Sequence, residues 1–130
     1  MLPGPVWGEA ERARVFTLLR ATARPGGFSV ISGSQPPGVP VDFPAQLAAS
    51  MTESRVILDT SGSTLTEAVR HPIPGLEVLR MDGPEGEELA GKPLPSLSDT
   101  AEFAQSLVRR GVAKTVIVAR GAEGNVLADA

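Results

Sequence analysis

A chain of 130 residues is long enough to bury one hydrophobic core, and its composition, 42% apolar and 21% charged, is typical of a folded globular protein. The formal net charge is −3 and basic residues stand side by side only at Arg109-Arg110, so the sequence lacks the basic stripe of a nucleic-acid-binding surface. The absence of cysteine excludes disulfide bonds and thiolate metal sites, and the single histidine, His71, excludes a histidine-rich metal centre.

No apolar run approaches the roughly 20 residues that a membrane-spanning helix needs. The beginning of the chain, MLPGPVWGEAE, also lacks the basic start and apolar core of a signal peptide. We therefore expect a cytoplasmic protein with neither a membrane nor a nucleic acid among its partners.

The first half of the chain predicts helices and strands in alternation. Apolar residues recur on one stripe over residues 9–21, which predicts a helix, and the β-branched run over 28–34 predicts a strand. A second helix is expected over 42–53, with Asp42 as its N-cap, followed by a second strand over 55–61.

The second half continues the same alternation. Helices are expected over residues 63–70, 85–90 and 98–110, and strands over 76–82, 115–121 and, returning after a tight turn, 125–130. Ser63 stands at the start of the first of these helices as its cap. Ser96 to Asp99 resembles a capping box before the third helix, and Gly111 fits its end.

Strands and helices that alternate are typical of an α/β protein with a mostly parallel sheet, right-handed crossovers and helices on both faces. The strand candidates are short and nearly continuously apolar, as strands buried on both faces are. We therefore expect a three-layer α/β/α, Rossmann-like fold in a single domain over residues 1–130.

Polar residues collect at the carboxyl ends of the expected parallel strands, where open α/β sheets bind their ligands. These ends read Ser32-Gly33-Ser34, Asp59-Thr60-Ser61, Arg80-Met81-Asp82 and Ala119-Arg120-Gly121. Every strand must end in a loop, and Ser, Asp and Gly are common loop residues, so each end by itself also fits a structural turn.

Two of these ends have residues that could bind a ligand, and each also has a purely structural interpretation. Asp82 and Glu85, three residues apart at a helix start, either hold Mg²⁺ through water and phosphate oxygens or complement the helix dipole. Arg80 either binds a phosphate or pairs with Glu77 or Asp82. The segment 121–124 either lies against a nucleotide or forms only a hairpin turn.

The order of the motifs is more specific than any one of them. The segments ISGSQPPGVP (31–40), VILDTSGSTL (56–65), ELAGKPL (88–94) after an acidic patch, and TVIVARGAEGNVL (115–127) follow one another along the chain. In this order they resemble the middle of a sugar kinase of the ribokinase superfamily, in its PfkB branch. That branch includes phosphofructokinase and the fructose-1-phosphate and tagatose-6-phosphate kinases. The resemblance covers essentially all 130 residues.

The resemblance implies transfer of a phosphoryl group from ATP, with Mg²⁺, to a hydroxyl of a sugar phosphate. By match, Ser32, Gly33 and Ser34 lie near the sugar. The family's Lys-Pro-Asn-x-x-Glu motif falls on residues 80–85, which puts Arg80, Asp82 and Glu85 at the nucleotide and gives Asp82 and Glu85 to the metal. The family's Ser-x-Gly motif falls on residues 119–121, which adds Gly121 to the nucleotide site.

The departures from the family are also specific. At these two motifs only Glu85 and Gly121 keep the family's residue, and the Gly-Ala-Gly-Asp segment that supplies the family's anion hole and catalytic base does not occur in these 130 residues. We therefore expect a truncated member that is not a competent kinase by itself and has no catalytic residue of its own. The alternatives are a nucleotide-binding module without catalysis and a self-associating module, a homo-oligomer formed through exposed sheet edges.

Overall fold

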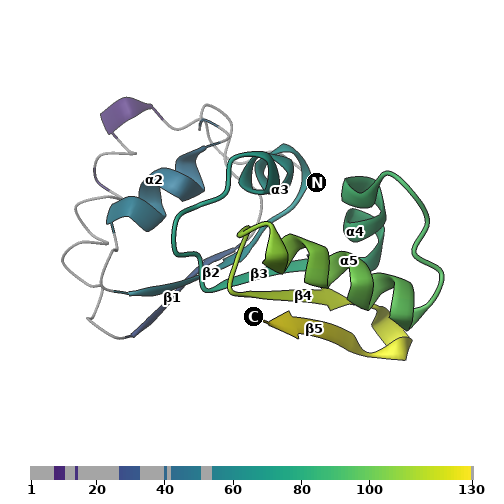
Figure 1. The fold of residues 1–130 in the computed structure, drawn as a ribbon. Coiled ribbons are helices and arrows are strands. Elements are labelled where there is room, and N and C mark those ends of the chain that lie inside the picture. Colours follow the sequence, from purple (N-terminus) through teal and green to yellow (C-terminus); the bar gives the residue numbers. More distant parts are fainter. Residues whose placement is uncertain are drawn as a thin grey trace.

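The computed structural model describes residues 8–10, 14, 27–32, 40, 42–50 and 54–129. Its elements follow the expected order (Figure 1). They are β1 (Phe28–Ser32), α2 (Phe43–Ser50), β2 (Arg55–Asp59), α3 (Gly62–Arg70), β3 (Val78–Asp82), α4 (Gly83–Ala90), α5 (Leu97–Arg109), β4 (Thr115–Ala119), a 3₁₀ turn η1 (Gly121–Glu123) and β5 (Asn125–Asp129). Among these helices, none has the length and apolar character that a bilayer-crossing segment requires.

The strands form one sheet in the order β1-β2-β3-β4-β5. The first four are parallel, and β5 returns antiparallel to β4. This confirms the α/β class with a mostly parallel sheet, and it confirms the returning strand at the end.

The helices α2 to α5 all lie on one side of the sheet (Figure 1). The reason is the strand order. Each parallel strand is added next to the preceding one in the same direction, so right-handed crossovers carry every connecting helix over the same face. Helices on the second face are not among the described residues, and most of the helix expected over 9–21 lies outside them.

The core lies between the sheet and these helices. Alternate residues of the central strands point into it, and Leu58, Leu79, Val116 and Val118 are completely buried there. Residues of the helices complete the same cluster, among them Phe43, Leu47, Leu65, Ala104 and Leu107. The sheet is thus held by aliphatic packing on one face.

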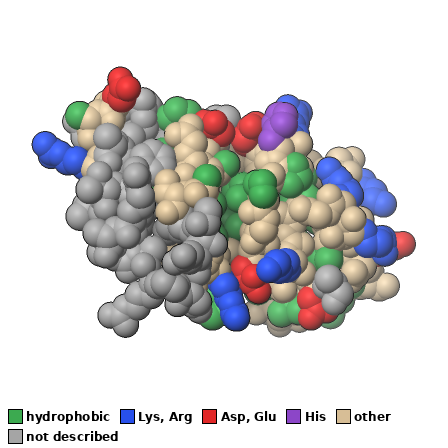
Figure 2. Space-filling view, turned by 60° about the vertical axis from the view of Figure 1, so that its left-hand side comes forward, with side chains coloured by type: hydrophobic (Ala, Val, Ile, Leu, Met, Phe, Trp, Pro, Cys, Tyr) green, Lys and Arg blue, Asp and Glu red, His purple; other side chains and the backbone are tan. Residues whose placement is uncertain are grey.

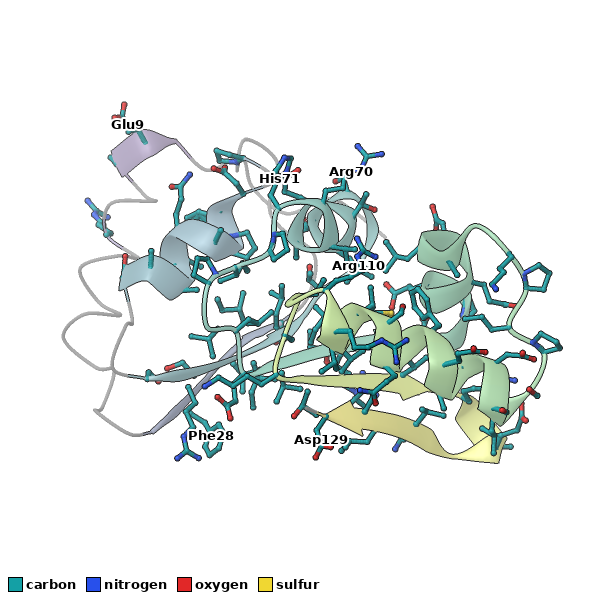
Figure 3. All side chains as sticks on the ribbon, in the orientation of Figure 1. Glu9, Phe28, Arg70, His71, Arg110 and Asp129 are labelled. Atoms are coloured by element: carbon teal, nitrogen blue, oxygen red, sulfur yellow. The ribbon has the colours of Figure 1, made fainter. Side chains whose placement is uncertain are left out.

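We call the other side of the sheet the open face. Phe28 and Val30 of β1 and Leu127 of β5 lie on it with 60%, 62% and 61% of their surface exposed. Figure 3 shows the side chains of Phe28 and Asp129 on the side away from the helices. The Arg55 guanidinium lies 5.3 Å from the centre of the Phe28 ring, so a cation–π contact covers part of this surface.

The cap expected before α5 is confirmed, and the cap expected for α3 is not. Ser96 accepts a hydrogen bond from the Asp99 backbone N–H at 3.0 Å and donates to the Asp99 carboxylate, so the capping motif before α5 is confirmed. The assignment of Ser63 as the cap of α3 was wrong. The Leu65 N–H bonds to the carbonyl of Ser61 at 3.4 Å, so the helix begins earlier, with Ser61 as N-cap and Ser63 inside it.

Candidate functional site at the carboxyl ends of β3 and β4

The carboxyl ends of the parallel strands lie along one edge of the sheet. Ser32 is the register partner of Asp59, which pairs in turn with Arg80. Asp82 pairs with Ala119 on the other side of β3. The structure therefore brings the described members of the expected site to one edge, with Ser32 exposed at the end of β1; Gly33 and Ser34 lie outside the described residues.

The start of α4 is organised by a reciprocal capping box. The Asp82 carboxylate accepts the Glu85 backbone N–H at 2.8 Å, and the Glu85 carboxylate accepts the Asp82 backbone N–H at 2.9 Å. Pro84 in the first turn has no N–H to leave unsatisfied, so it fits this position. The box fixes both carboxylates between the end of β3 and the start of α4, where they also complement the helix dipole.

The electrostatic environment favours the protonated form of Glu85. Partial burial raises the pKa of Glu85 above its ordinary value, the hydrogen bond from the Asp82 backbone N–H opposes this rise, and the negative charges of Asp82 and Asp59 add to it. Burial is therefore the main cause of the raised pKa of Glu85, and the negative charges of Asp82 and Asp59 are smaller ones.

The donor set at this place fits Mg²⁺ held largely through water. The capping box uses Asp82 Oδ1 and Glu85 Oε1, so one oxygen of each carboxylate is left outside the box. Oxygen ligands with retained waters are what Mg²⁺ prefers. Among the described residues there is no group of three or more acidic or histidine side chains close enough to enclose a metal without such waters.

Next to the capping box a pocket of about 440 Å³ opens between β3, β4 and the loop that joins α4 to α5. Its lining includes Asp82, Gly83, Ala119 and Gly121, together with Leu94 and Pro95 of the loop. Gly121 has φ +57°, a left-handed conformation that a residue with a Cβ adopts only with strain, so glycine suits the turn that forms this wall. The pocket joins the two segments that the family motifs singled out, 80–85 and 119–121.

Arg80 does not line this pocket. Leu79 and Met81 point into the core, so the alternation of the strand turns Arg80 to the open face, where its guanidinium is 3.4 Å from the Asp59 carboxylate. The two partners that the sequence suggested, Glu77 and Asp82, are not those observed, and Glu77 instead pairs with Lys114 at 3.3 Å.

Sequence reasoning placed Arg120 at the end of a strand without a role, and it missed the residues that contact Arg120. Arg120 lines the pocket with Glu87 and Glu123, and its guanidinium is hydrogen-bonded to the loop between α4 and α5. The position of Arg120 directly after a buried strand was a signal that it lies at the ligand edge. Its partners in the loop are far away in sequence and carried no signal.

Two other hollows contain none of the predicted site residues. The larger, about 540 Å³, lies between α4 and α5 and is lined by Leu89, Phe103 and Arg110 among others. The smaller, about 300 Å³, is lined mostly by alanines of α2 and by the turn at Gly75. On the face shown in Figure 2, acidic and basic side chains of the described residues are interspersed, so surface charge does not single out another site there.

Comparison with known proteins identifies the family that this chain is similar to. A profile of the pfkB family carbohydrate kinases matches residues 6–130. The ATP-dependent 6-phosphofructokinase isozyme 2 of Mycobacterium tuberculosis is 35% identical over 130 residues and 98% of this chain. The 1-phosphofructokinase of Xanthomonas campestris is 36% identical over 126 residues and 95% of this chain.

Solved structures show the same fold. Phosphofructokinase-2 from Escherichia coli in complex with fructose-6-phosphate superposes with a TM-score of 0.88 at 30% identity, over 100% of this chain and 43% of that one. A tetrameric inhibited form of the same enzyme superposes with a TM-score of 0.86. The chain spans 37% and 39% of the length of the two curated relatives.

Proposed function

Because this chain belongs to the pfkB family of carbohydrate kinases, we propose that it forms the nucleotide side and part of the sugar side of a kinase cleft. The reaction would be phosphoryl transfer from ATP to a hydroxyl of a fructose or tagatose phosphate. The observation that carries this proposal is the pocket that contains both Asp82 and Gly121, since these residues come from the two motif segments of the nucleotide site.

Within this cleft the described residues have separate roles. Asp82 and Glu85 would hold Mg²⁺ through water at the start of α4, and Gly121 would let the nucleotide approach the backbone. Mg²⁺, when bound, neutralises charge on the transferred phosphoryl group. The capping box holds the two carboxylates in place before any ligand arrives, which lowers the cost of ordering them on binding.

Ser32, Gly33 and Ser34 would face the sugar. Ser32 ends β1, which is three strands from β4 in the sheet order. Adjacent strands lie about 4.8 Å apart, so the end of β1 is roughly 14 Å from the end of β4. This separation supports two binding regions on one edge, with the sugar at β1 and the nucleotide at β3 and β4.

Binding of MgATP tests the nucleotide side. In calorimetric titrations of the 130-residue chain, Glu85→Gln should weaken the Mg²⁺-dependent part of ATP binding, because it removes a carboxylate charge while keeping an oxygen that can accept the Asp82 N–H. Glu88→Gln is the matched control, since Glu88 is an exposed acid on the same helix. Equal affinity of MgATP for all three proteins would contradict the metal assignment.

We further propose that the 130-residue polypeptide does not turn over by itself, because none of its segments matches the family's base-bearing Gly-Ala-Gly-Asp. A coupled assay of ADP release with fructose 6-phosphate, fructose 1-phosphate and tagatose 6-phosphate tests this. ADP release faster than in the reaction without protein would contradict this proposal. The sugar phosphate with the fastest release would then identify the substrate.

A second candidate function, self-association, is favoured by the open face. Phe28 and Val30 at one edge of the sheet and Leu127 at the other edge expose apolar side chains, and exposed apolar patches often mark sites of association. In sedimentation the chain should associate at micromolar concentration, and Val30→Ser with Leu127→Ser should shift it toward monomer. Leu97→Ser is the control, because Leu97 is an exposed leucine at the start of α5 rather than on the open face. A clean monomer for the unmodified chain would count against this candidate.

A further inference from the structure

Arg120 lies directly after β4, and its side chain is only 11% exposed. Its Nη1 atom donates to the Leu94 carbonyl and, at 2.7 Å, to Thr100 Oγ1. Its Nη2 atom donates to the Pro95 carbonyl at 3.3 Å and to the Glu123 carboxylate at 3.0 Å. We call this group, Arg120 with Leu94, Pro95, Thr100 and Glu123, the Arg120 clamp.

The clamp joins Arg120 to two elements that are distant in sequence and to one that follows it directly. Leu94 and Pro95 belong to the loop between α4 and α5, Thr100 lies in the first turn of α5, and Glu123 belongs to η1. A planar guanidinium can serve several acceptors spread around it at once, whereas a lysine ammonium offers a single point of charge. Arginine is therefore the residue that suits this position.

The same loop is held from the opposite side by α4. The Leu94 backbone N–H donates to the Glu87 carboxylate at 2.7 Å, so both polar backbone groups of Leu94 are bonded, one to α4 and the other to Arg120. Leu94 is also buried, with 2% of its surface exposed. The loop is thus held between α4 on one side and Arg120 on the other.

These contacts build one wall of the candidate nucleotide pocket. Glu87, Leu94, Pro95, Arg120 and Glu123 all line it. Both Nη atoms of Arg120 are engaged by protein acceptors, so a phosphate could reach them only by displacing a loop carbonyl, Thr100 or the Glu123 carboxylate. The Arg120 guanidinium therefore binds the residues that form the pocket wall rather than the ligand.

We propose that Arg120 is a positioning residue that locks the segment 91–96 as a preformed wall of the nucleotide pocket. The inference rests on the proposed function for the identity of the ligand, MgATP. The locking itself rests only on the contacts of Arg120. A preformed wall avoids the cost of ordering the loop when the nucleotide binds, so release of the clamp should lower affinity.

The test compares Arg120→Met, Arg120→Lys and, as the matched control, Arg109→Met, which removes an exposed arginine from the last turn of α5. Amide hydrogen exchange of Leu94 reports the lock. In Arg120→Met this exchange should accelerate by about tenfold or more, the scale expected when charge-assisted hydrogen bonds are lost, while amides of β3 and β4 keep their protection. Arg120→Lys should restore part of the protection, and Arg109→Met should change nothing.

Affinity for MgATP is the second measurement. If Arg120 only stabilised the fold, this affinity would not change in variants that remain folded. The dissociation constant should rise in Arg120→Met and recover partly in Arg120→Lys. Unchanged Leu94 exchange in Arg120→Met overturns the clamp, and faster exchange with unchanged affinity overturns its role in the pocket. If the unmodified chain binds no MgATP, the proposed function fails and with it this role, while the exchange result still decides the lock.

Discussion

The two faces of the sheet are built from alternate residues of the same strands, yet their burial differs, most of all in the edge strands β1 and β5. On the covered face Ile31 of β1 and Ala128 of β5 are buried, whereas on the open face their neighbours Val30 and Leu127 are 62% and 61% exposed. All four are aliphatic residues in strands. Burial therefore depends on the direction of the crossovers, which put every described helix on one face of the sheet (Figure 1). It does not follow from the hydrophobicity of the strand residues alone.

The largest expected contrast between the faces is in stability. Leu79→Ala should lower the free energy of unfolding by about 2–5 kcal/mol, because it leaves a cavity in a fully packed core. Val30→Ala on the open face should cost under about 1 kcal/mol, the span of strand propensity. Urea denaturation of the two variants measures both values. Similar losses for the two would mean that the open face is covered in solution.

Changes at the junction of β3 and α4 should lower the stability by less than changes in the core. Asp82→Ala removes the N-cap and should cost about 0.5–2 kcal/mol of stability, whereas Asp82→Asn keeps a capping oxygen and should cost much less. Thermal unfolding distinguishes the two variants. Equal destabilisation by both would show that the charge of Asp82, rather than its cap, matters for folding.

A smaller effect is expected from the ion pair on the open face. Arg80 and Asp59 are 45% and 40% exposed in their side chains, so Arg80→Met should change the unfolding free energy by only about 0–1 kcal/mol. Raising the salt concentration should remove most of the difference between the variant and the unmodified chain. A loss as large as that of Leu79→Ala would mean that the pair is shielded from solvent.

The smallest effect is the pH dependence that Glu85 contributes. The pKa of this carboxyl is raised in the folded chain, so the folded state binds its proton more tightly than the unfolded state does. The stability that this gives is present below the unfolded pKa and is lost as the pH rises through the folded pKa. Glu85→Gln does not titrate, so its free energy of unfolding should rise slightly relative to that of the unmodified chain as the pH rises through this window. Denaturation series at several pH values measure this difference. A relative rise in the stability of Glu85→Gln as the pH falls would contradict the prediction.

Much of the fold could be predicted from the sequence because its signals are local. Short β-branched runs marked the strands, and polar residues before apolar stripes marked the helix starts, as Ser96 with Asp99 did for α5. Alternation within β3 could also have shown that Arg80 faces away from Met81 and the core. It was instead assigned to the nucleotide through the motif alone, an assignment that remains a prediction.

The contacts that shape the pocket could not be predicted in the same way. Arg120 bonds to residues 20 to 26 positions earlier in the chain, and nothing in the sequence near Leu94 or Thr100 indicates a cationic partner. Carbonyl groups are the same in every residue, so a side chain that recognises them leaves no pattern. Such positions become visible only when the elements are placed in space.

The order of the strands also has a consequence for how the chain acquires its structure. Each strand pairs with the one made just before it, so every new strand meets an edge that already exists. Chains are synthesised from the N-terminus at about 5–20 residues per second, which is slow compared with the formation of local structure. We expect the sheet to grow strand by strand in the order of translation. The β4–β5 hairpin, whose connection is the shortest between paired strands, should be added last.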